Sequence, residues 1–410
     1  MNPIAEKIDP LPHLGRTTHL IAPPIKAARA WLSDITITDK KPLIDLSQAA
    51  PTAPPPLAMR QAMSEHVLGD GDAHLYGPIL GNLDLRQALS NKWARVYGID
   101  FSAENVAITS GCNQAFCAVI AGLCTSGDEV ILTAPWYFNH DMWLTLSNVN
   151  TRALYCDDTL IPDAQAARDL INENTRALCL VTPNNPAGVE YPDHVLNDFL
   201  SLAKQYNLNL IIDETYLDFR TTDAVHSLWD HPAAKDHLIV LYSFSKAYRL
   251  TGHRVGAVIA APQKISEVEK FLDTVTICPA QTGQFAAHWG LTHLDAWVEE
   301  ERQNTIQKLS LFREAFARLA PYGWSLLGSG AYFAYVAHPF DMGSEEAAKA
   351  ILKDAHVLTL PGSFFTPDEE RFGKNHLRVA FANIDAETIE TLIDRLIEVS
   401  IRLAPAENPA

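Results

Sequence analysis

Between residues 105 and 261, short runs of apolar, β-prone residues alternate with helix-length stretches. The apolar runs cover 105–109, 129–133, 152–156, 176–182, 208–214, 238–243 and 255–261, and amphipathic helical patterns lie at 112–124, 163–172 and 192–206. Strands separated by helices favour a mostly parallel sheet that is covered by helices on both faces. The pattern therefore predicts an α/β fold built on a seven-stranded, mostly parallel sheet.

The regions on either side of this block predict a second, smaller domain. Residues 46–56, LSQAAPTAPPP, form a Pro/Ala-rich extended link before it. After it we expect one long helix over 279–320, a β-like run at 331–337, a helix at 343–353, a strand at 376–381 and a last helix from Asp385. We predict a large ligand-binding domain over 46–285 and a small α+β domain over 286–410. Residues 1–45 are expected to form an N-terminal arm and part of the small domain.

Charge and cysteine usage exclude several classes of function. The net charge of −17 argues against a nucleic-acid-binding surface or a patch that binds anionic membranes. None of the six cysteines belongs to a Cys-x-x-Cys pair, so no metal site is predicted. The chain has no run of eighteen apolar residues, and its first residues lack the pattern of a signal peptide. A cytoplasmic enzyme without a membrane partner is the expectation.

Unusual polar residues follow the carboxyl ends of the apolar runs. SGCNQA follows the first run, PWYFNH the second, PNNPAG the fourth, and DETY and SFSK belong to the ends of the fifth and sixth. Ligands of open α/β sheets bind beyond the carboxyl ends of the strands. These segments are therefore expected to converge on one site.

The segment SFSK places Lys246 just past an apolar strand, with Ser243 before it and Arg254 eight residues after it. A lone lysine there would most often be a solvated strand-end residue. Ser-x-x-Lys also occurs in penicillin-binding enzymes, but the companion tripeptides Ser-Asp-Asn and Lys-Thr-Gly are missing from this chain. The amine of a lysine loses its proton more readily beside other cations or in a dry site.

Asp213 in LIIDETY ends a strongly apolar strand. Because an unpaired buried carboxylate is costly, it needs a partner. In order and type, the segments SGCNQA, TPNNPAG, DETY, SFSK, GHRVG and HLRVAF resemble the motifs of class I and II aminotransferases, which are fold-type I pyridoxal phosphate enzymes. The resemblance runs from about Pro42 to Arg378.

The resemblance implies a role for each motif residue. Lys246 would attach pyridoxal phosphate covalently, and Asp213 would pair with its pyridine nitrogen and make the ring an electron sink. Around the cofactor, the resemblance implies phosphate binding by Ser110, Gly111, Cys112, Ser243 and Arg254, contact with the ring oxygen by Asn185 and Tyr216, and stacking by Tyr137. His140 is either a residue that backs Asp213 or an ordinary structural histidine.

The resemblance also implies the substrate contacts and a homodimer with shared sites. Arg378 would bind the substrate α-carboxylate, with Asn185 nearby, and Tyr76 in LYGPILG would reach the phosphate in the neighbouring subunit. The chain departs from the family pattern at Ala49, where a glycine is usual, and at Ala187, where Thr or Ser is usual. The alanine at position 49 bears on the size or orientation of the substrate.

The expected reaction is transfer of the amino group of an L-α-amino acid to a 2-oxo acid. Alternatives on the same scaffold are β- or γ-elimination and oxidation of an amino acid. A non-catalytic pyridoxal-binding regulator would need a DNA-binding module, and the 41 residues before Pro42 are too few and insufficiently basic for one.

Overall fold

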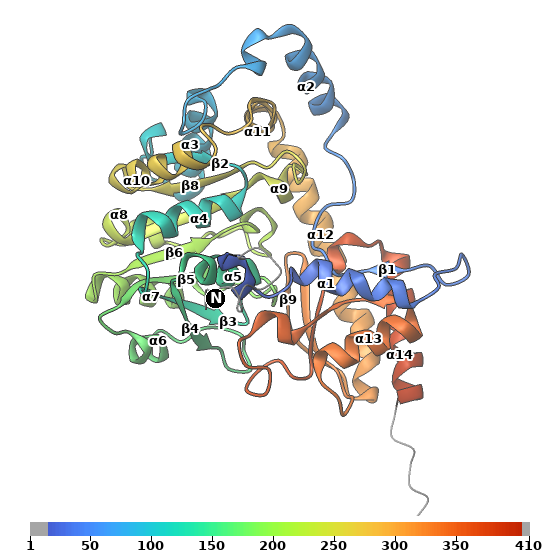
Figure 1. Cartoon of the computed structure of the whole chain (residues 1–410). Helices are drawn as coiled ribbons and strands as arrows, with labels where there is room; N and C mark the ends of the chain where they lie inside the picture. The colour runs from blue at the N-terminus through green and yellow to red at the C-terminus, as the bar shows by residue number, and fades with distance from the viewer. Residues whose placement is uncertain (1–14, 404–410) are drawn as a thin grey trace, which may run out of the picture.

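The computed structural model describes residues 15–403, and a seven-stranded sheet lies at the centre of its larger part (Figure 1). The strands follow the order β2-β8-β7-β6-β5-β3-β4. Their bounds are β2 Val106–Thr109, β3 Glu129–Ala134, β4 Asn150–Tyr155, β5 Thr175–Val181, β6 Asn209–Asp213, β7 Leu238–Ser243 and β8 Gly256–Ala260. Strand β8 is antiparallel to both β2 and β7, and the other pairings are parallel. The predicted α/β class and the mostly parallel sheet are confirmed.

Helices cover both faces of this sheet because the strand side chains alternate between two apolar cores. In β6, Ile211 packs on one face, and Leu210 and Ile212 pack on the other. The first face is covered by α4 Cys112–Leu123, α5 Phe138–Ser147 and α10 Pro262–Val275. The second face is covered by α3 Leu83–Tyr97, α6 Ala164–Leu170, α7 Asp193–Gln205 and α11 Gln281–His293, with the short α8 Ala234–His237 close to α7.

The smaller part of the molecule is built on an antiparallel sheet of order β12-β13-β10-β9. Its strands are β9 Ser325–Gly330, β10 Phe333–Ala337, β12 Leu360–Pro361 and β13 His376–Val379. The helices α12 Asp295–Phe316, α13 Ser344–Ala355 and α14 Ala386–Leu403 share a separate apolar core with this sheet (Figure 1). Strand β9 consists of the run SLLGSG, which we did not predict as a strand.

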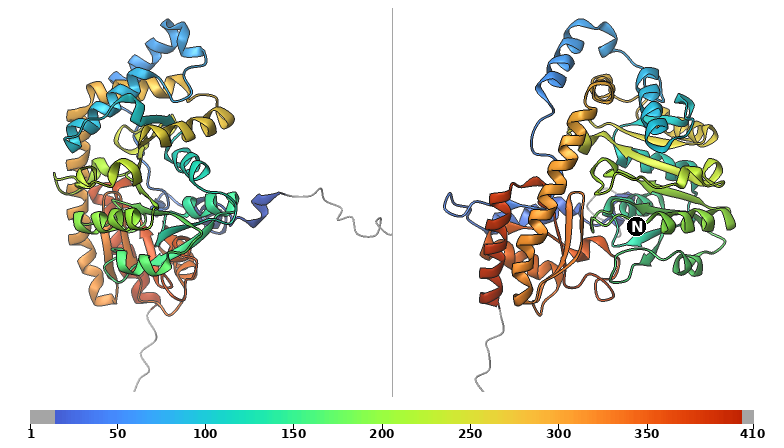
Figure 2. Two further views of the ribbon diagram at one scale, coloured as in Figure 1. Left: turned by 90° about the vertical axis from the view of Figure 1, so that its left-hand side faces the viewer. Right: turned by 180° about the vertical axis from the view of Figure 1, so that it is seen from behind.

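The N-terminal segment joins this smaller part before the chain crosses to the large sheet. Strand β1 Ile44–Asp45 pairs in parallel with β11 Val357–Leu358, and α1 Pro24–Ala30 lies near β12. The link over 46–56 then leads to α2 Leu57–Gly69, which packs against α11 at the far end of the molecule (Figure 2). The link therefore passes between the two parts of the fold.

The prediction of one long helix over 279–320 is wrong. Helix α11 ends at His293, α12 begins at Asp295, and Leu294 between them has φ −114° and ψ 15°. The two helices meet different neighbours, since α11 packs on α2 and α3 whereas α12 packs on α14. The buried side chain of Leu294 anchors the bend in the core of the large sheet. Tertiary packing thus overrides the helical propensity of the continuous stretch.

In the described part of the chain, no helix combines the length and the apolar character that crossing a membrane requires. The ends of two predicted segments, residues 1–14 of the arm and 404–410 of the small domain, lie outside the described residues. The division at residues 45 and 285 stays a prediction.

Candidate active site

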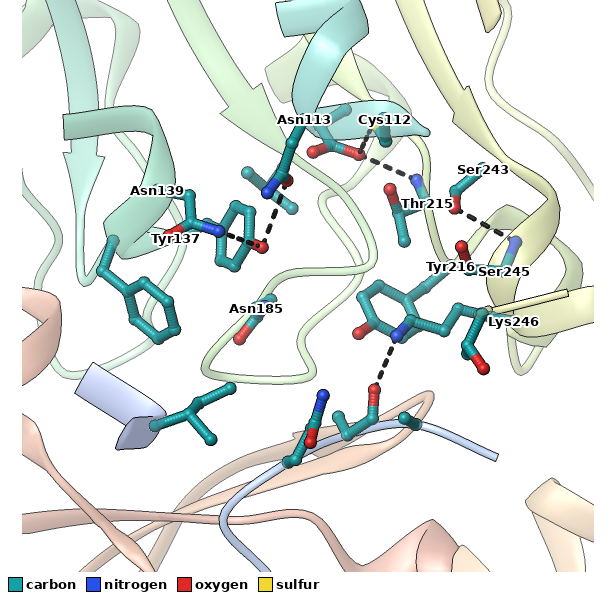
Figure 3. A pocket seen from close by; sticks show the side chains of 18 of the residues that line it. Cys112, Asn113, Tyr137, Asn139, Asn185, Thr215, Tyr216, Ser243, Ser245 and Lys246 are labelled. Carbon is teal, nitrogen blue, oxygen red and sulfur yellow. Dashed lines mark hydrogen bonds between the residues drawn. The ribbon is translucent and has the colours of Figure 1, made fainter. Parts of the chain in front are cut away.

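A cavity of about 410 Å³ lies at the carboxyl ends of the central strands, where the link and the smaller part of the molecule meet the large sheet (Figure 3). Nine of the residues predicted to bind the cofactor or the substrate line it, and so does Ala49; the nine are Cys112, Tyr137, Asn185, Asp213, Tyr216, Ser243, Lys246, Arg254 and Arg378. They come from the carboxyl ends of five strands or the segments that follow those strands, and from β13 of the smaller part. The strand-end motifs therefore converge as the topology predicts.

The amine of Lys246 lies in the cavity close to the link. Its Nζ donates a hydrogen bond of 2.6 Å to the carbonyl oxygen of Ala49 (Figure 3). Burial, followed by the guanidinium groups of Arg378 and Arg254, lowers the pKa of Lys246 to about 8. About a tenth of this amine is therefore neutral, and nucleophilic, at pH 7.

Asp213 is buried at the end of β6 and has several hydrogen-bond donors around it. His140 Nε2 lies 3.3 Å from Asp213 Oδ2, and the backbone N–H of Thr215 donates to Oδ1 over 2.9 Å. Burial alone would raise the pKa of Asp213, but the hydrogen bonds and charge of His140, together with Thr215, hold it below its usual value. His140 is itself stacked on Phe116 at 4.0 Å, which fixes its ring. The result is a carboxylate that stays ionised in a dry site.

The amino end of α4 forms one wall of the cavity, and two glycines allow close approach there. Gly111 has φ +88°, and a Cβ on it would collide with the guanidinium of Arg254. A Cβ on Gly256 would lie 2.6 Å from the backbone nitrogen of Cys112. Arg254 itself has φ +52° and places Nη1 3.4 Å from Ser245 Oγ. Helix N–H groups, hydroxyls and a guanidinium in one place make a site for a dianion such as phosphate.

Arg378 is buried against the rings of Phe333 and Phe365, each 5.2 Å from its guanidinium carbon. Its Nη1 donates to Asn185 Oδ1 over 3.1 Å, and its Nη2 donates to the carbonyl oxygen of Ser47. The Nε–H finds no acceptor within residues 15–403. Burial lowers the pKa of Arg378 to about 10, so it remains cationic at neutral pH. An incompletely paired guanidinium in a cavity is suited to a carboxylate.

Two hydrogen bonds orient the side chain of Tyr137, which lies across the cavity from Lys246. The side-chain amide of Asn139 donates to Tyr137 Oη over 2.8 Å, and Tyr137 Oη donates to Asn113 Oδ1 over 3.2 Å (Figure 3). Burial, followed by the charge of Asp213, raises the pKa of Tyr137 to about 12, so the phenol stays neutral. The ring of Tyr137 meets that of His140 edge-on at 5.2 Å.

Three of the sequence-predicted residues do not line the cavity in this chain. Ser110 and Gly111 directly precede Cys112 at the start of α4, where the backbone of Ser110 is bonded to Gln114. Tyr76 lies elsewhere on the surface, and its side chain is 80% exposed. Sequence reasoning missed Asn113, Asn139, Thr215 and Ser245, which lie beside predicted residues in the same strand-end segments. Because they belong to the strand-end segments, they could have been predicted from the sequence as residues that line the cavity.

The model of the family described as aminotransferase class I and II matches residues 41–396. The chain belongs to this family. The predicted family and the predicted enzyme class are thus confirmed. The match takes in the whole central sheet and every strand-end segment of the cavity.

This aminotransferase resembles curated members of the family at low identity. It is 27% identical to an aspartate aminotransferase of Pyrococcus horikoshii over 87% of this chain and 91% of the relative. It is 28% identical to an aromatic aminotransferase of Arabidopsis thaliana over 78% of this chain and 80% of the relative. The aspartate aminotransferase of Thermus thermophilus solved with maleate has the same fold, with a TM-score of 0.84 at 24% identity over 95% of this chain and 100% of that structure.

Proposed function

We propose that this aminotransferase binds pyridoxal 5′-phosphate on Lys246 and transfers the amino group of an L-α-amino acid to a 2-oxo acid. The observation that carries the proposal is the amine of Lys246, whose pKa is about 8, in one cavity with the paired carboxylate of Asp213 and the guanidinium of Arg378. A nucleophilic amine, a permanent anion and a carboxylate-binding cation are the three groups that the reaction requires.

The residues of the cavity fit both the phosphate group and the pyridine ring of the cofactor. The start of α4 with Cys112, the hydroxyl of Ser243 and the guanidinium of Arg254 would hold the phosphate, with Ser110 and Gly111 supplying backbone at the same turn. The carboxylate of Asp213 would hold a protonated pyridine nitrogen, Tyr216 and Asn185 would contact the ring oxygen, and Tyr137 would cover one ring face. Pyridoxal phosphate, when bound, supplies an electron sink for negative charge at the substrate α-carbon.

The link over 46–56 supplies acceptors that the substrate would replace. The carbonyl oxygens of Ser47 and Ala49 accept from Arg378 Nη2 and Lys246 Nζ, respectively. A substrate carboxylate would displace the Ser47 carbonyl from Arg378, because a guanidinium attracts an anion more strongly than a neutral carbonyl and can donate two parallel hydrogen bonds to it. Lys246, once the substrate amine has displaced it from the cofactor, would be free to take the proton from the substrate α-carbon as a general base.

The fate of the reaction is tested by one half-reaction without an acceptor acid. We expect the enzyme to release one equivalent of 2-oxo acid per site, to leave the cofactor aminated and then to stop. The measurement is the visible absorbance of the cofactor together with assays for oxo acid and ammonia. Continuous release of ammonia would favour β- or γ-elimination instead, and oxygen consumption in step with it would favour an oxidase.

We further propose a homodimer in which Tyr76 serves the site of the other subunit. Leu75, Tyr76 and Ile277 are 62%, 80% and 46% exposed. The backbone N–H of Gly77 donates to Cys278 Sγ over 3.3 Å, which brings Tyr76 and Ile277 to the same surface. Large apolar side chains gathered at one place on a surface are typical of an interface. The interface would lie beside α11.

The dimer is tested by subunit complementation. A chain with Tyr76→Phe but intact Lys246 is mixed, after mild denaturation and renaturation, with a chain carrying Lys246→Ala but intact Tyr76. Because one site of each heterodimer then contains both native residues, the mixture should be more active than either variant alone. Light scattering after gel filtration measures the mass. A fully active monomer would contradict the proposal.

A further inference from the structure

A buried polar cluster lies behind three of the segments that line the cavity, on the face of the large sheet that α3 covers. It consists of Lys92 from α3, Asp218 from η5 Leu217–Phe219, Tyr242 from β7, and Tyr248, which follows α9 Phe244–Ala247. Each of the four residues is less than a tenth exposed. Because they are buried within one chain, a second subunit is not needed to assemble the cluster.

The ammonium of Lys92 is the centre of the cluster. Its Nζ donates to Asp218 Oδ1 over 2.5 Å and to Tyr242 Oη over 3.0 Å, and Tyr248 Oη lies 3.5 Å away. Tyr242 Oη in turn donates to Asp218 Oδ2 over 2.5 Å. An ammonium has three N–H donors, and each of them has an acceptor here. Burial alone would lower the pKa of Lys92, but Asp218 holds it above its usual value, so the ammonium stays charged.

The partners of Lys92 are neighbours in sequence of residues that line the cavity. Each lies one or two positions away from such a residue: Tyr242 before Ser243, Asp218 after Tyr216, and Tyr248 after Lys246. Successive residues of a strand point to opposite faces, so Tyr242 reaches the cluster while Ser243 faces the cavity. One ammonium on α3 thereby connects the three segments that carry these cavity residues.

Stability alone does not explain an ion pair at this place. Removing two charges from water is costly, and well-packed apolar residues of similar volume often give the same stability or more. Hydrogen bonds are directional, unlike apolar contacts, so the cluster specifies where its members lie. The surrounding rings leave Tyr242 little freedom, since Trp93 and Phe244 meet it edge-on at 5.0 and 5.2 Å.

We propose that Lys92 is a positioning residue, whose bonds to Asp218, Tyr242 and Tyr248 hold the cofactor-binding segments in their reactive geometry. The inference rests on the proposed function and adds to it a residue that does not line the cavity. A displacement of about 1 Å far from the chemistry can lower a rate by about a hundredfold. Loss of the ammonium should therefore be visible in the reaction even when the fold survives.

A double variant tests this inference without leaving a buried charge. Lys92→Met and Asp218→Asn are combined, because removing one charge alone would leave the other unpaired. Both replacements keep the approximate size of the side chain, and the amide at position 218 can still accept from Tyr242. We expect the double variant to unfold at close to the native temperature, yet to lose about tenfold or more in kcat/KM with an amino acid that the native enzyme accepts.

The pKa of Lys246 in the cofactor-free enzyme provides a readout other than activity. Burial, followed by Arg378 and Arg254, lowers this pKa to about 8. Asp213 and Cys112 act in the opposite sense. A less firmly held Lys246 would be better hydrated, so its pKa should rise toward the ordinary value of a lysine. The measurement is the rate of pyridoxal phosphate uptake against pH, whose midpoint should move upward in the double variant.

An ion pair at the opposite edge of the sheet provides the control. Arg176 pairs with Asp128 over 2.8 Å at the amino ends of β5 and β3, so Arg176→Met should change neither readout. If the double variant does not fold, Tyr242→Phe, which keeps the ion pair, should show both changes in smaller measure. A folded variant in which either readout stays native would overturn the inference and leave the proposed function standing. A native enzyme that transfers no amino group would overturn the proposed function instead.

Discussion

Replacing Lys246 with alanine is expected to lower the kcat of amino transfer severely. Loss of a general base alone usually lowers kcat by ~10²–10⁴-fold. The loss should exceed this range because the same amine also attaches the cofactor. Steady-state kinetics with an amino acid that the native enzyme accepts measure it. Lys270→Ala, at an exposed position on α10, is the matched control and should leave kcat unchanged. Activity of Lys246→Ala within tenfold of the native enzyme would show that another residue is the base.

The pKa of Lys246 gives the same prediction a second readout. Because the pKa is about 8, the neutral fraction of the amine rises about tenfold per pH unit below that value and levels off above it. The rate at which the cofactor-free enzyme takes up pyridoxal phosphate should follow this fraction. Borohydride reduction of the loaded enzyme should then leave the label on the peptide that contains Lys246. A pH-independent uptake rate, or label on another lysine, would contradict the assignment.

Replacing Arg378 with alanine is expected to weaken every α-amino acid substrate by roughly ten- to a hundred-fold in kcat/KM. A hydrogen bond to a charged group contributes ~1.5–3 kcal/mol, and Arg378 lines the cavity with a buried guanidinium. Amines without a carboxylate should lose much less, because they have no group for Arg378 to bind. The measurement is the half-reaction rate with an amino acid and with the matching amine.

Two controls separate this role of Arg378 from a structural one. Arg318 on the surface pairs with Glu390, and Arg318→Ala should leave both kinds of substrate unaffected. Thermal unfolding of Arg378→Ala reports any loss of packing against Phe333 and Phe365. Equal losses for amino acids and amines in a well-folded Arg378→Ala enzyme would assign the residue to something other than carboxylate binding.

Much of the fold could be predicted from the sequence, because each strand of the large sheet corresponds to a short, local run of apolar residues. All seven apolar runs became strands of one sheet, with ends shifted by at most a few residues. The helix predicted over 279–320 failed for the opposite reason, since helical propensity is local but the bend at Leu294 depends on what α11 and α12 pack against. Strand β9, whose run contains two glycines, has a weak local signal and is held by its pairing with β10.

Ala49 shows why the residue types in a sequence motif predict only some of the contacts in a site. The sequence marked it as a departure from the family, and the expected consequence concerned its side chain. In the structure its backbone carbonyl accepts from Lys246, a bond that any residue at this position could make. The choice of alanine therefore says little about that contact, which depends on the path of the link across the cavity.

The sequence by itself determined the sheet, the strand-end segments and the kinds of chemical group that they carry, because apolar periodicity and the rule for ligand sites in α/β folds act over short stretches of chain. Only the tertiary structure decided how those groups affect one another. It lowers the pKa of Lys246 by burying it beside Arg254 and Arg378, and it sets His140 against Asp213. Electrostatic effects depend on the distances between charged groups and on their burial. Neither quantity can be predicted from the spacing of the residues along the chain.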